Sequence, residues 1–165
     1  ATPPSGVAAF FGAFAPPTAA TVRARAPAAA PLPRTCCRNV PRFTAMSRVD
    51  DVRWTALAFY DDIAFGMAPG QELDLEATIC GEVRLNRSVI AFGQASTDPG
   101  YACHPLPGRY GFESYLSVPI FGPDGTIFGT VCALDPDPRE LSQAILDAIQ
   151  AHATWLGTQL PALVR

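Results

Sequence analysis

The chain has 165 residues, of which 48% are hydrophobic and 10% aromatic, enough apolar surface for one domain core but not for two typical domains. Its net charge of −3 is unevenly distributed, because residues 1–49 carry six Arg and no acid whereas residues 50–165 carry six Arg and all fifteen acids. The acidic excess of residues 50–165 argues against nucleic-acid or anionic-membrane partners, and the absence of Lys excludes P-loop, Schiff-base and protein-kinase lysine chemistry.

Residues 1–41 are rich in Ala, Pro and Arg, a composition that does not form a packed core. The longest apolar run, residues 6–15, is followed by two prolines and is far shorter than the roughly 20 residues of a membrane-spanning helix. We therefore predict a disordered or poorly ordered segment over residues 1–41 and one folded domain over residues 42–165.

The first half of that domain contains three predicted elements. Residues 42–49 and 53–60 are strand-like runs on either side of a short polar turn, which predicts a β-hairpin. Apolar positions at helical spacing predict a short helix over residues 75–85. A brief strand is expected over residues 88–92.

The second half contains the strongest local signal in the chain. Residues 113–120 and 126–134 are two nearly continuous apolar runs around a Pro-Asp-Gly turn, which predicts a hairpin covered on both faces. The preceding residues 96–110 contain several Pro and Gly and are expected to be irregular, so they can form a pocket wall.

A long helix is expected to end the domain. Asp137 is a suitable N-cap and Pro138 a suitable first helical residue, and the apolar residues that follow have helical spacing. Pro161 is expected to stop the helix. The predicted fold class is therefore α+β, with one antiparallel sheet and helices packed on one face.

Several motifs together resemble a GAF domain, the small-ligand and sensory fold of bacterial signalling proteins. They are Thr78-Ile79-Cys80, Asp98-Pro99, His104-Pro105, the run from Tyr110 to Ile120, Asp124-Gly125, and the run from Phe128 to Pro136. The resemblance covers residues 42–160. Residues 66–73 are also similar to the segment that precedes the helix predicted here over residues 75–85, as found in GAF domains of sensor histidine kinases.

The resemblance implies a central antiparallel sheet with loops covering a ligand pocket on the face opposite the helices. It also implies a regulatory input module without catalysis of its own, with a homodimer partner and a histidine kinase or other output module in trans. The family usually begins with a helix that packs beside the last one, and residues 1–41 are poor material for such a helix, which puts that helix and the dimer interface it often builds in doubt. No particular ligand or cofactor is implied, since GAF pockets take cyclic nucleotides, pigments or amino-acid derivatives.

The candidate ligand-binding residues have aromatic or polar side chains and lie in the segments that resemble a GAF domain. In the strand over residues 113–120, Tyr115 and Ser117 alternate with Leu116 and Val118, so the polar groups share one side, where a cavity is expected. The full candidate set is Tyr60, Cys80, Asp98, His104, Tyr110, Phe112, Tyr115, Ser117 and Cys132.

The cysteines support two alternative functions. An odd count of five fits a reducing, cytoplasmic location, and the wide spacing of Cys80, Cys103 and Cys132 argues against a metal site. Free methionine-(R)-sulfoxide reductases of the GAF fold carry cysteines in places similar to Cys80 and Cys103. In such an enzyme Glu113 and Asp135 would hold the substrate amine or protonate the leaving oxygen. GAF-fold bilin photosensors attach their pigment through a Cys-His pair, which Cys103 and His104 resemble.

Overall fold

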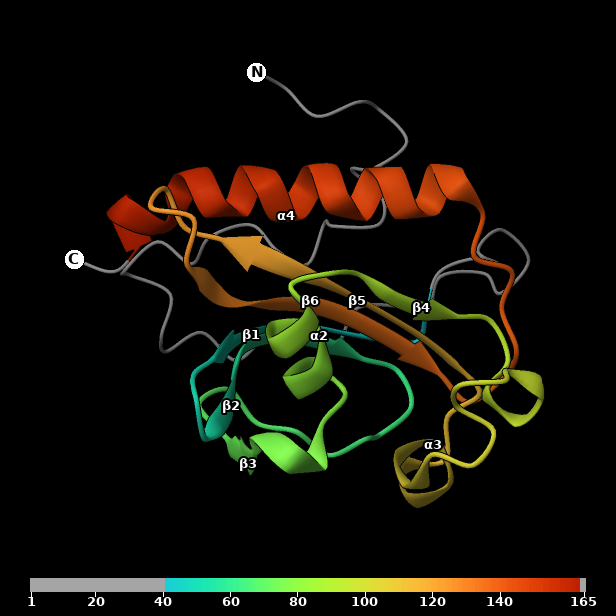
Figure 1. Ribbon diagram of the computed structural model, residues 1–165. Helices are drawn as coiled ribbons and strands as arrows, with labels where there is room; N and C mark the ends of the chain where they lie inside the picture. The colour runs from blue at the N-terminus through green and yellow to red at the C-terminus, as the bar shows by residue number, and fades with distance from the viewer. Residues whose placement is uncertain (1–40, 164–165) are drawn as a thin grey trace, which may run out of the picture. The chain divides into compact units, whose positions relative to one another are not determined.

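A computed structural model describes residues 41–163, with side chains through residue 161. The predicted disorder of residues 1–41 falls outside this range, Pro41 excepted. In the described part, one six-stranded antiparallel sheet has the strand order β3-β2-β1-β6-β5-β4 (Figure 1). The strands are β1 Phe43–Val49, β2 Arg53–Asp61, β3 Glu72–Asp74, β4 Ile90–Phe92, β5 Ser114–Phe121 and β6 Ile127–Asp135. Both predicted hairpins, β1–β2 and β5–β6, are confirmed.

Helices lie on both faces of the sheet. They are η1 Leu75–Ala77, α2 Cys80–Asn86, η2 Ala95–Thr97, α3 Pro105–Tyr110 and α4 Gln143–Leu163. The long helix α4 packs on β5 and β6, and the short α2 packs on β5, β6 and β1 from the other side (Figure 1). The fold is α+β, as predicted, and the face opposite α4 carries short helices as well as loops.

The predicted helix over residues 75–85 is divided in two. Thr78 has an extended backbone, with φ −139° and ψ 145°, and both its amide and its hydroxyl donate to the carbonyl of Leu75, at 3.0 and 2.9 Å. A single 3₁₀ turn therefore precedes the break, and α2 begins only at Cys80. The apolar residues from which we predicted one helix therefore belong to two short helices, η1 and α2.

Residues 105–110, which we predicted to be an irregular segment, form helix α3. His104 caps α3, since its Nδ1 accepts a hydrogen bond from the amide of Leu106 at 3.3 Å. Gly111 ends the helix in the left-handed region, at φ 71°, and its amide donates to the carbonyl of Pro107. Proline is tolerated in the first turn of a helix, so the two prolines here begin α3 instead of preventing it.

The predicted start of the last helix is wrong. Helix α4 begins at Gln143, five residues after Pro138. Asp137 does not act as its N-cap, because its carboxylate accepts a hydrogen bond from Arg42. The amide of Arg139 donates to the carbonyl of Gly93 at 2.9 Å, which fixes the connecting segment in a non-helical path.

The end of α4 also differs from expectation. Pro161 lies inside the helix, which continues to Leu163. None of the helices within residues 41–163 has the length and apolar character needed to cross a bilayer.

Candidate functional site

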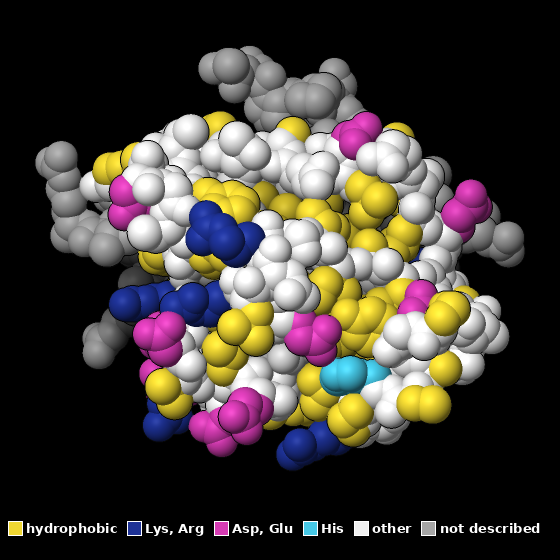
Figure 2. All heavy atoms as spheres, in the orientation of Figure 1, with side chains coloured by type: hydrophobic (Ala, Val, Ile, Leu, Met, Phe, Trp, Pro, Cys, Tyr) yellow, Lys and Arg dark blue, Asp and Glu magenta, His cyan; other side chains and the backbone are white. Residues whose placement is uncertain are grey.

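A cavity of about 60 Å³ lies between the sheet, α2, α3 and the irregular segment over residues 62–71. It is lined by Phe43, Trp54, Phe65, Met67, Leu73, Ala77, Thr78, Ile79, Cys80, Leu106, Tyr110, Phe112, Tyr115, Cys132 and Leu134. The lining contains no Asp, Glu, Lys, Arg or His. On the surface around α2 and α3, hydrophobic side chains lie among acidic ones (Figure 2).

A β-bulge decides which residues of β2 face the cavity. The register of β1 and β2 shifts so that Leu57 has no opposite residue, and such an extra residue reverses the alternation of side chains beyond it. Trp54 therefore faces inward before the bulge and Phe59 packs on the core after it. Tyr60, a candidate ligand residue, is 44% exposed and does not line the cavity.

The polar groups of the cavity wall gather around one thiol. The Sγ of Cys80 lies 3.2 Å from Thr130 Oγ1, 3.3 Å from Tyr115 Oη and 3.8 Å from Ser117 Oγ. The neighbouring Cys132 thiol is the largest cause of the lowered pKa of Cys80. The same contact raises the pKa of Cys132, whereas burial is the main cause of the raised pKa of Tyr115.

One polar group of the wall has no partner. Trp54 is only 4% exposed, and its indole Nε1 is buried without a hydrogen-bond partner among the described residues. Buried polar groups are nearly always paired, so an unpaired donor beside a cavity calls for an explanation.

Helix α2 is attached to the loop before α3 through one carboxylate. Glu82 accepts a hydrogen bond from Tyr101 Oη at 3.0 Å, and its other oxygen lies 3.1 Å from His104 Nε2. Burial and the neighbouring Glu82 together raise the pKa of Tyr101 to about 12, so this hydroxyl stays protonated and remains a donor. His104 thus connects α2 and α3, and it does not line the cavity.

Two more contacts shape the same wall. Tyr110 lines the cavity and its hydroxyl donates to the carbonyl of Ala77 at 3.2 Å, which joins α3 to η1. Asp98 lies outside the cavity, where its Oδ1 accepts from the amides of Gly100 and Tyr101 and forms a turn.

The segment after β2 is held by Asp61. Its carboxylate accepts from the amides of Ile63, Phe65 and Gly66 at 3.0–3.1 Å, and this turn brings Phe65 into the cavity wall. Burial alone would raise the pKa of Asp61, but the backbone donors outweigh it and hold the pKa below its usual value.

The residues of the reductase alternative are not brought together at the cavity. Cys103 is exposed and does not line it. The Glu113 carboxylate accepts from the amide and hydroxyl of Ser96, at 3.1 and 2.9 Å. In β6, Cys132 and Leu134 line the cavity, so alternation directs Asp135 to the other face of the sheet.

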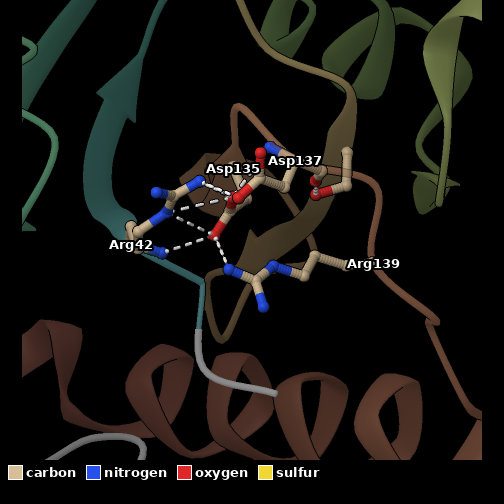
Figure 3. A network of polar contacts seen from close by, with 5 residues as sticks. Arg42, Asp135, Asp137 and Arg139 are labelled. Carbon is tan, nitrogen blue, oxygen red and sulfur yellow. Dashed lines mark hydrogen bonds and ion pairs between the residues drawn. The ribbon is translucent and has the colours of Figure 1, made fainter. Parts of the chain in front are cut away.

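Asp135 is instead the centre of a buried ionic cluster that connects distant parts of the chain. Its oxygens accept from Arg42 Nη2 and Arg139 Nη2, both at 2.7 Å, and from the amide of Asp137 at 2.9 Å (Figure 3). Burial would raise the pKa of Asp135, but these donors lower it overall. The cluster joins the start of β1 to the segment leading into α4.

Of the nine predicted ligand residues, five line the cavity: Cys80, Tyr110, Phe112, Tyr115 and Cys132. Ser117 lies beside it through its contact with Cys80, whereas Tyr60, Asp98 and His104 do not line it. The sequence analysis missed Phe43, Trp54, Phe65 and Met67. For Trp54 a signal existed, since a large aromatic residue near the start of a predicted strand is a candidate core residue.

The sequence model of the GAF domain family matches residues 34–160. The chain belongs to the GAF family. The GAF domain is a sensory and regulatory fold. The six-stranded antiparallel sheet of this chain agrees with that family assignment. No curated protein matches this sequence.

Solved structures with the same fold belong to proteins with different activities. The GAF domain of the Acinetobacter phosphoenolpyruvate-protein phosphotransferase is 16% identical, with a TM-score of 0.55 over 72% of this chain and 69% of that one. The free methionine-R-sulfoxide reductase from Neisseria meningitidis is 18% identical, with a TM-score of 0.56 over 74% and 68%. The cyanobacteriochrome receptor PixJ is 20% identical, with a TM-score of 0.59 over 74% and 85%. At these identities the likeness concerns the fold.

Proposed function

We propose that this GAF domain is a regulatory input module that binds a small uncharged molecule in the cavity and performs no catalysis of its own. The observation that carries the proposal is a cavity wall without acidic or basic residues, which includes Trp54, whose buried indole N–H has no hydrogen-bond partner among the described residues. Leaving a buried donor unsatisfied costs about 1–3 kcal/mol. A ligand oxygen or nitrogen that accepts from this N–H would recover that free energy.

The chemistry of the wall favours this ligand class over those of the two alternatives. An amino-acid sulfoxide is a zwitterion, and burying its charges without charged partners is costly. The lining contains no Arg, Lys or His to pair with its carboxylate. A bilin is far larger than a cavity of about 60 Å³, which has room for only a few non-hydrogen atoms unless its wall moves.

In the proposed mechanism, the effect of ligand binding is transmitted from the cavity to α4 through contacts on both faces of the sheet. A ligand would order residues 98–110, which contact α2 through Glu82 and η1 through Tyr110. Cys132 and Leu134 of β6 also line the cavity, and β6 leads through the Asp135 cluster to α4. A ligand that binds one arrangement of these contacts better than another shifts the position of α4.

The biological setting of this module is the part of the proposal that rests on sequence resemblance. We place it among GAF domains that act with bacterial sensor histidine kinases or another output module, in the cytoplasm and as a homodimer. Within the chain, residues 42–165 would be the sensory unit and residues 1–41 a separate segment.

The two tryptophans of the chain allow a direct test. Trp54 lines the cavity, whereas Trp155 lies on α4 and is 44% exposed, so a ¹H–¹⁵N spectrum contains two indole signals that Trp54→Phe assigns. We expect titration with acetone, which has four non-hydrogen atoms, to shift the Trp54 signal downfield and to leave the Trp155 signal in place. Isobutene, which has the same shape without an acceptor, should not produce the downfield shift.

The charge argument has its own control. Acetate, an anion of the same size that also carries acceptors, should leave the Trp54 signal unchanged because the wall contains no Arg, Lys or His to pair with its charge. A Trp54 signal that responds to none of these probes, or a Trp155 signal that responds equally, would overturn the proposed ligand site.

A further inference from the structure

Two cysteines from different elements meet in the cavity wall. Cys80 begins α2 and Cys132 lies in the middle of β6, and they are 2% and 4% exposed. Both residues line the cavity. The Cys80 Sγ lies 3.8 Å from Ser117 Oγ, and Ser117 is the residue of β5 that is paired with Cys132 of β6. Two buried cysteines brought together in this way on one cavity wall can form a disulfide inside a folded domain.

The environment of Cys80 is more polar than a cysteine used only for packing requires. Thr130 Oγ1 donates to its sulfur at 3.2 Å, and the Tyr115 and Ser117 hydroxyls lie within 3.8 Å. Thr130 is held in turn by Ser47, whose Oγ lies 2.9 Å from Thr130 Oγ1. Hydrogen bonds to the charged form of a thiol favour the thiolate, which is the nucleophilic form.

We propose that Cys80 and Cys132 are a peroxide-reactive thiol pair, with Cys80 as the sulfur that reacts first and Cys132 as the sulfur that resolves it. The oxidant is hydrogen peroxide or a small alkyl hydroperoxide that enters the cavity. This inference goes beyond ligand binding, and it holds whether or not the cavity also takes an uncharged ligand.

The reaction balances in two steps. In the first, the Cys80 thiolate attacks one peroxide oxygen, the O–O bond breaks, and the second oxygen leaves and takes up a proton as water or an alcohol. In the second, the Cys132 sulfur attacks the Cys80 sulfenic acid, the S–O bond breaks, and the hydroxyl leaves with the Cys132 proton as water. Two thiols lose two electrons in total, and the peroxide gains them.

The cavity gives the oxidant access and limits its size. Although both sulfurs are buried, the volume of about 60 Å³ beside them accommodates a molecule of two or three non-hydrogen atoms. Cys103 has the opposite properties, since it is exposed and does not line the cavity. If exposure alone controlled oxidation, Cys103 would react first; if the thiol pair controls it, Cys80 does.

The disulfide would act on the wall of the cavity. It would join the start of α2 covalently to β6, and α2 carries Glu82, which contacts Tyr101 and His104. It would also remove the acceptor that Thr130 Oγ1 uses. Oxidation is therefore expected to change the Trp54 indole signal as well as the state of the two thiols.

The test uses the full chain with Cys36, Cys37 and Cys103 replaced by Ser, so that Cys80 and Cys132 are the only cysteines left. After brief treatment with hydrogen peroxide, the protein is alkylated with N-ethylmaleimide under denaturing conditions and its intact mass is measured. We expect the loss of two hydrogens, no alkylation, and a cross-linked pair of peptides that contains both cysteines. Reduction before alkylation should restore two alkyl groups.

Two single variants in the same background separate the roles of the sulfurs. Cys132→Ser should accumulate a sulfenic acid on Cys80 that dimedone traps, whereas Cys80→Ser should leave Cys132 unmodified. Peptide mapping of the wild-type chain tests the same order without any substitution, so a variant that fails to fold does not decide the outcome.

Several results would overturn the proposal. They are full alkylation of both cysteines after peroxide treatment, oxidation of Cys103 ahead of Cys80 in the wild-type chain, and dimedone capture on Cys132 in place of Cys80. The acetone titration reports on Trp54 with the thiols reduced, so failure of the ligand proposal and failure of the thiol proposal are distinguishable.

Discussion

The two faces of the sheet treat their polar groups in opposite ways. On the α4 face, the Asp135 carboxylate is 0% exposed and accepts from two guanidinium groups and two backbone amides. On the cavity face, the Trp54 indole N–H is buried without a described partner. The buried carboxylate of the α4 face is paired with four donors, whereas a residue of the cavity wall carries a donor for which the described residues provide no partner.

Packing is also tighter on the α4 face than on the cavity face. Helix α4 approaches so closely that a Cβ on Gly157 would lie 2.2 Å from the carbonyl oxygen of Phe121. None of the cavity-lining residues belongs to α4. The comparison indicates that the α4 face supplies stability, whereas the cavity face gives up some stability and gains a site that can respond to a ligand.

The largest effect is expected from Asp135→Asn. The replacement keeps the shape but removes the charge and turns one acceptor into a donor that faces Arg42 and Arg139. Breaking a buried ion pair leaves the remaining charges uncompensated, so the free energy of unfolding should fall by about 3 kcal/mol in urea titrations.

Asp137→Asn is the matched control, because Asp137 is 66% exposed and contacts only one of the two guanidinium groups. A loss below about 1 kcal/mol is expected there. Equal losses would contradict the contrast.

Acid should weaken the α4 face through Asp135 and the cavity wall through Asp61. The pKa values of Asp135 and Asp61 lie below their ordinary value in the folded protein, so both carboxylates stabilise it above the unfolded-state pKa. That stabilisation is lost as the pH falls through the lower folded-state values. The free energy of unfolding should therefore decline below about pH 4. Asp135→Asn should make the decline shallower, and a slope unchanged by the variant would assign the acid sensitivity to other groups.

Gly157→Ala is expected to cost less, about 2 kcal/mol. Alanine favours helix, but the new Cβ would meet the backbone of Phe121, which does not yield as a flexible side chain would. Gly108→Ala is the control, since Gly108 lies in α3 and a Cβ there meets nothing within 4 Å. Thermal unfolding of the two variants measures the difference. A Gly157→Ala protein as stable as wild type would mean that α4 packs less tightly than its contacts indicate.

How far the sequence predicts this molecule depends on the range of the interactions. The β5–β6 hairpin follows from two apolar runs and the turn around Asp124-Gly125, which are all local signals. The start of α4 does not, because Asp137 is engaged by Arg42, 95 positions away. A strong local capping pattern is overridden by a contact that no local window contains.

The candidate site shows the same limit. Alternation in β5 predicts correctly that Tyr115 and Ser117 share a side. In β2 the bulge at Leu57 reverses the alternation, so Tyr60 faces away and Trp54 faces the cavity. A bulge depends on the pairing of β1 with β2, and neither strand alone encodes it.

The smallest effect is expected from Trp54→Phe, and it tests the contrast between the faces most directly. The change removes part of a buried ring, which costs stability, but it also removes an unsatisfied buried N–H, which returns about 1–3 kcal/mol. The two contributions oppose each other, so the free energy of unfolding should change by less than about 1 kcal/mol. Trp155→Phe on α4 controls for the loss of ring area at a position that is 44% exposed. A loss well above 2 kcal/mol at Trp54 would mean that its N–H is already paired in the folded protein, and the cavity face would then be as fully satisfied as the α4 face.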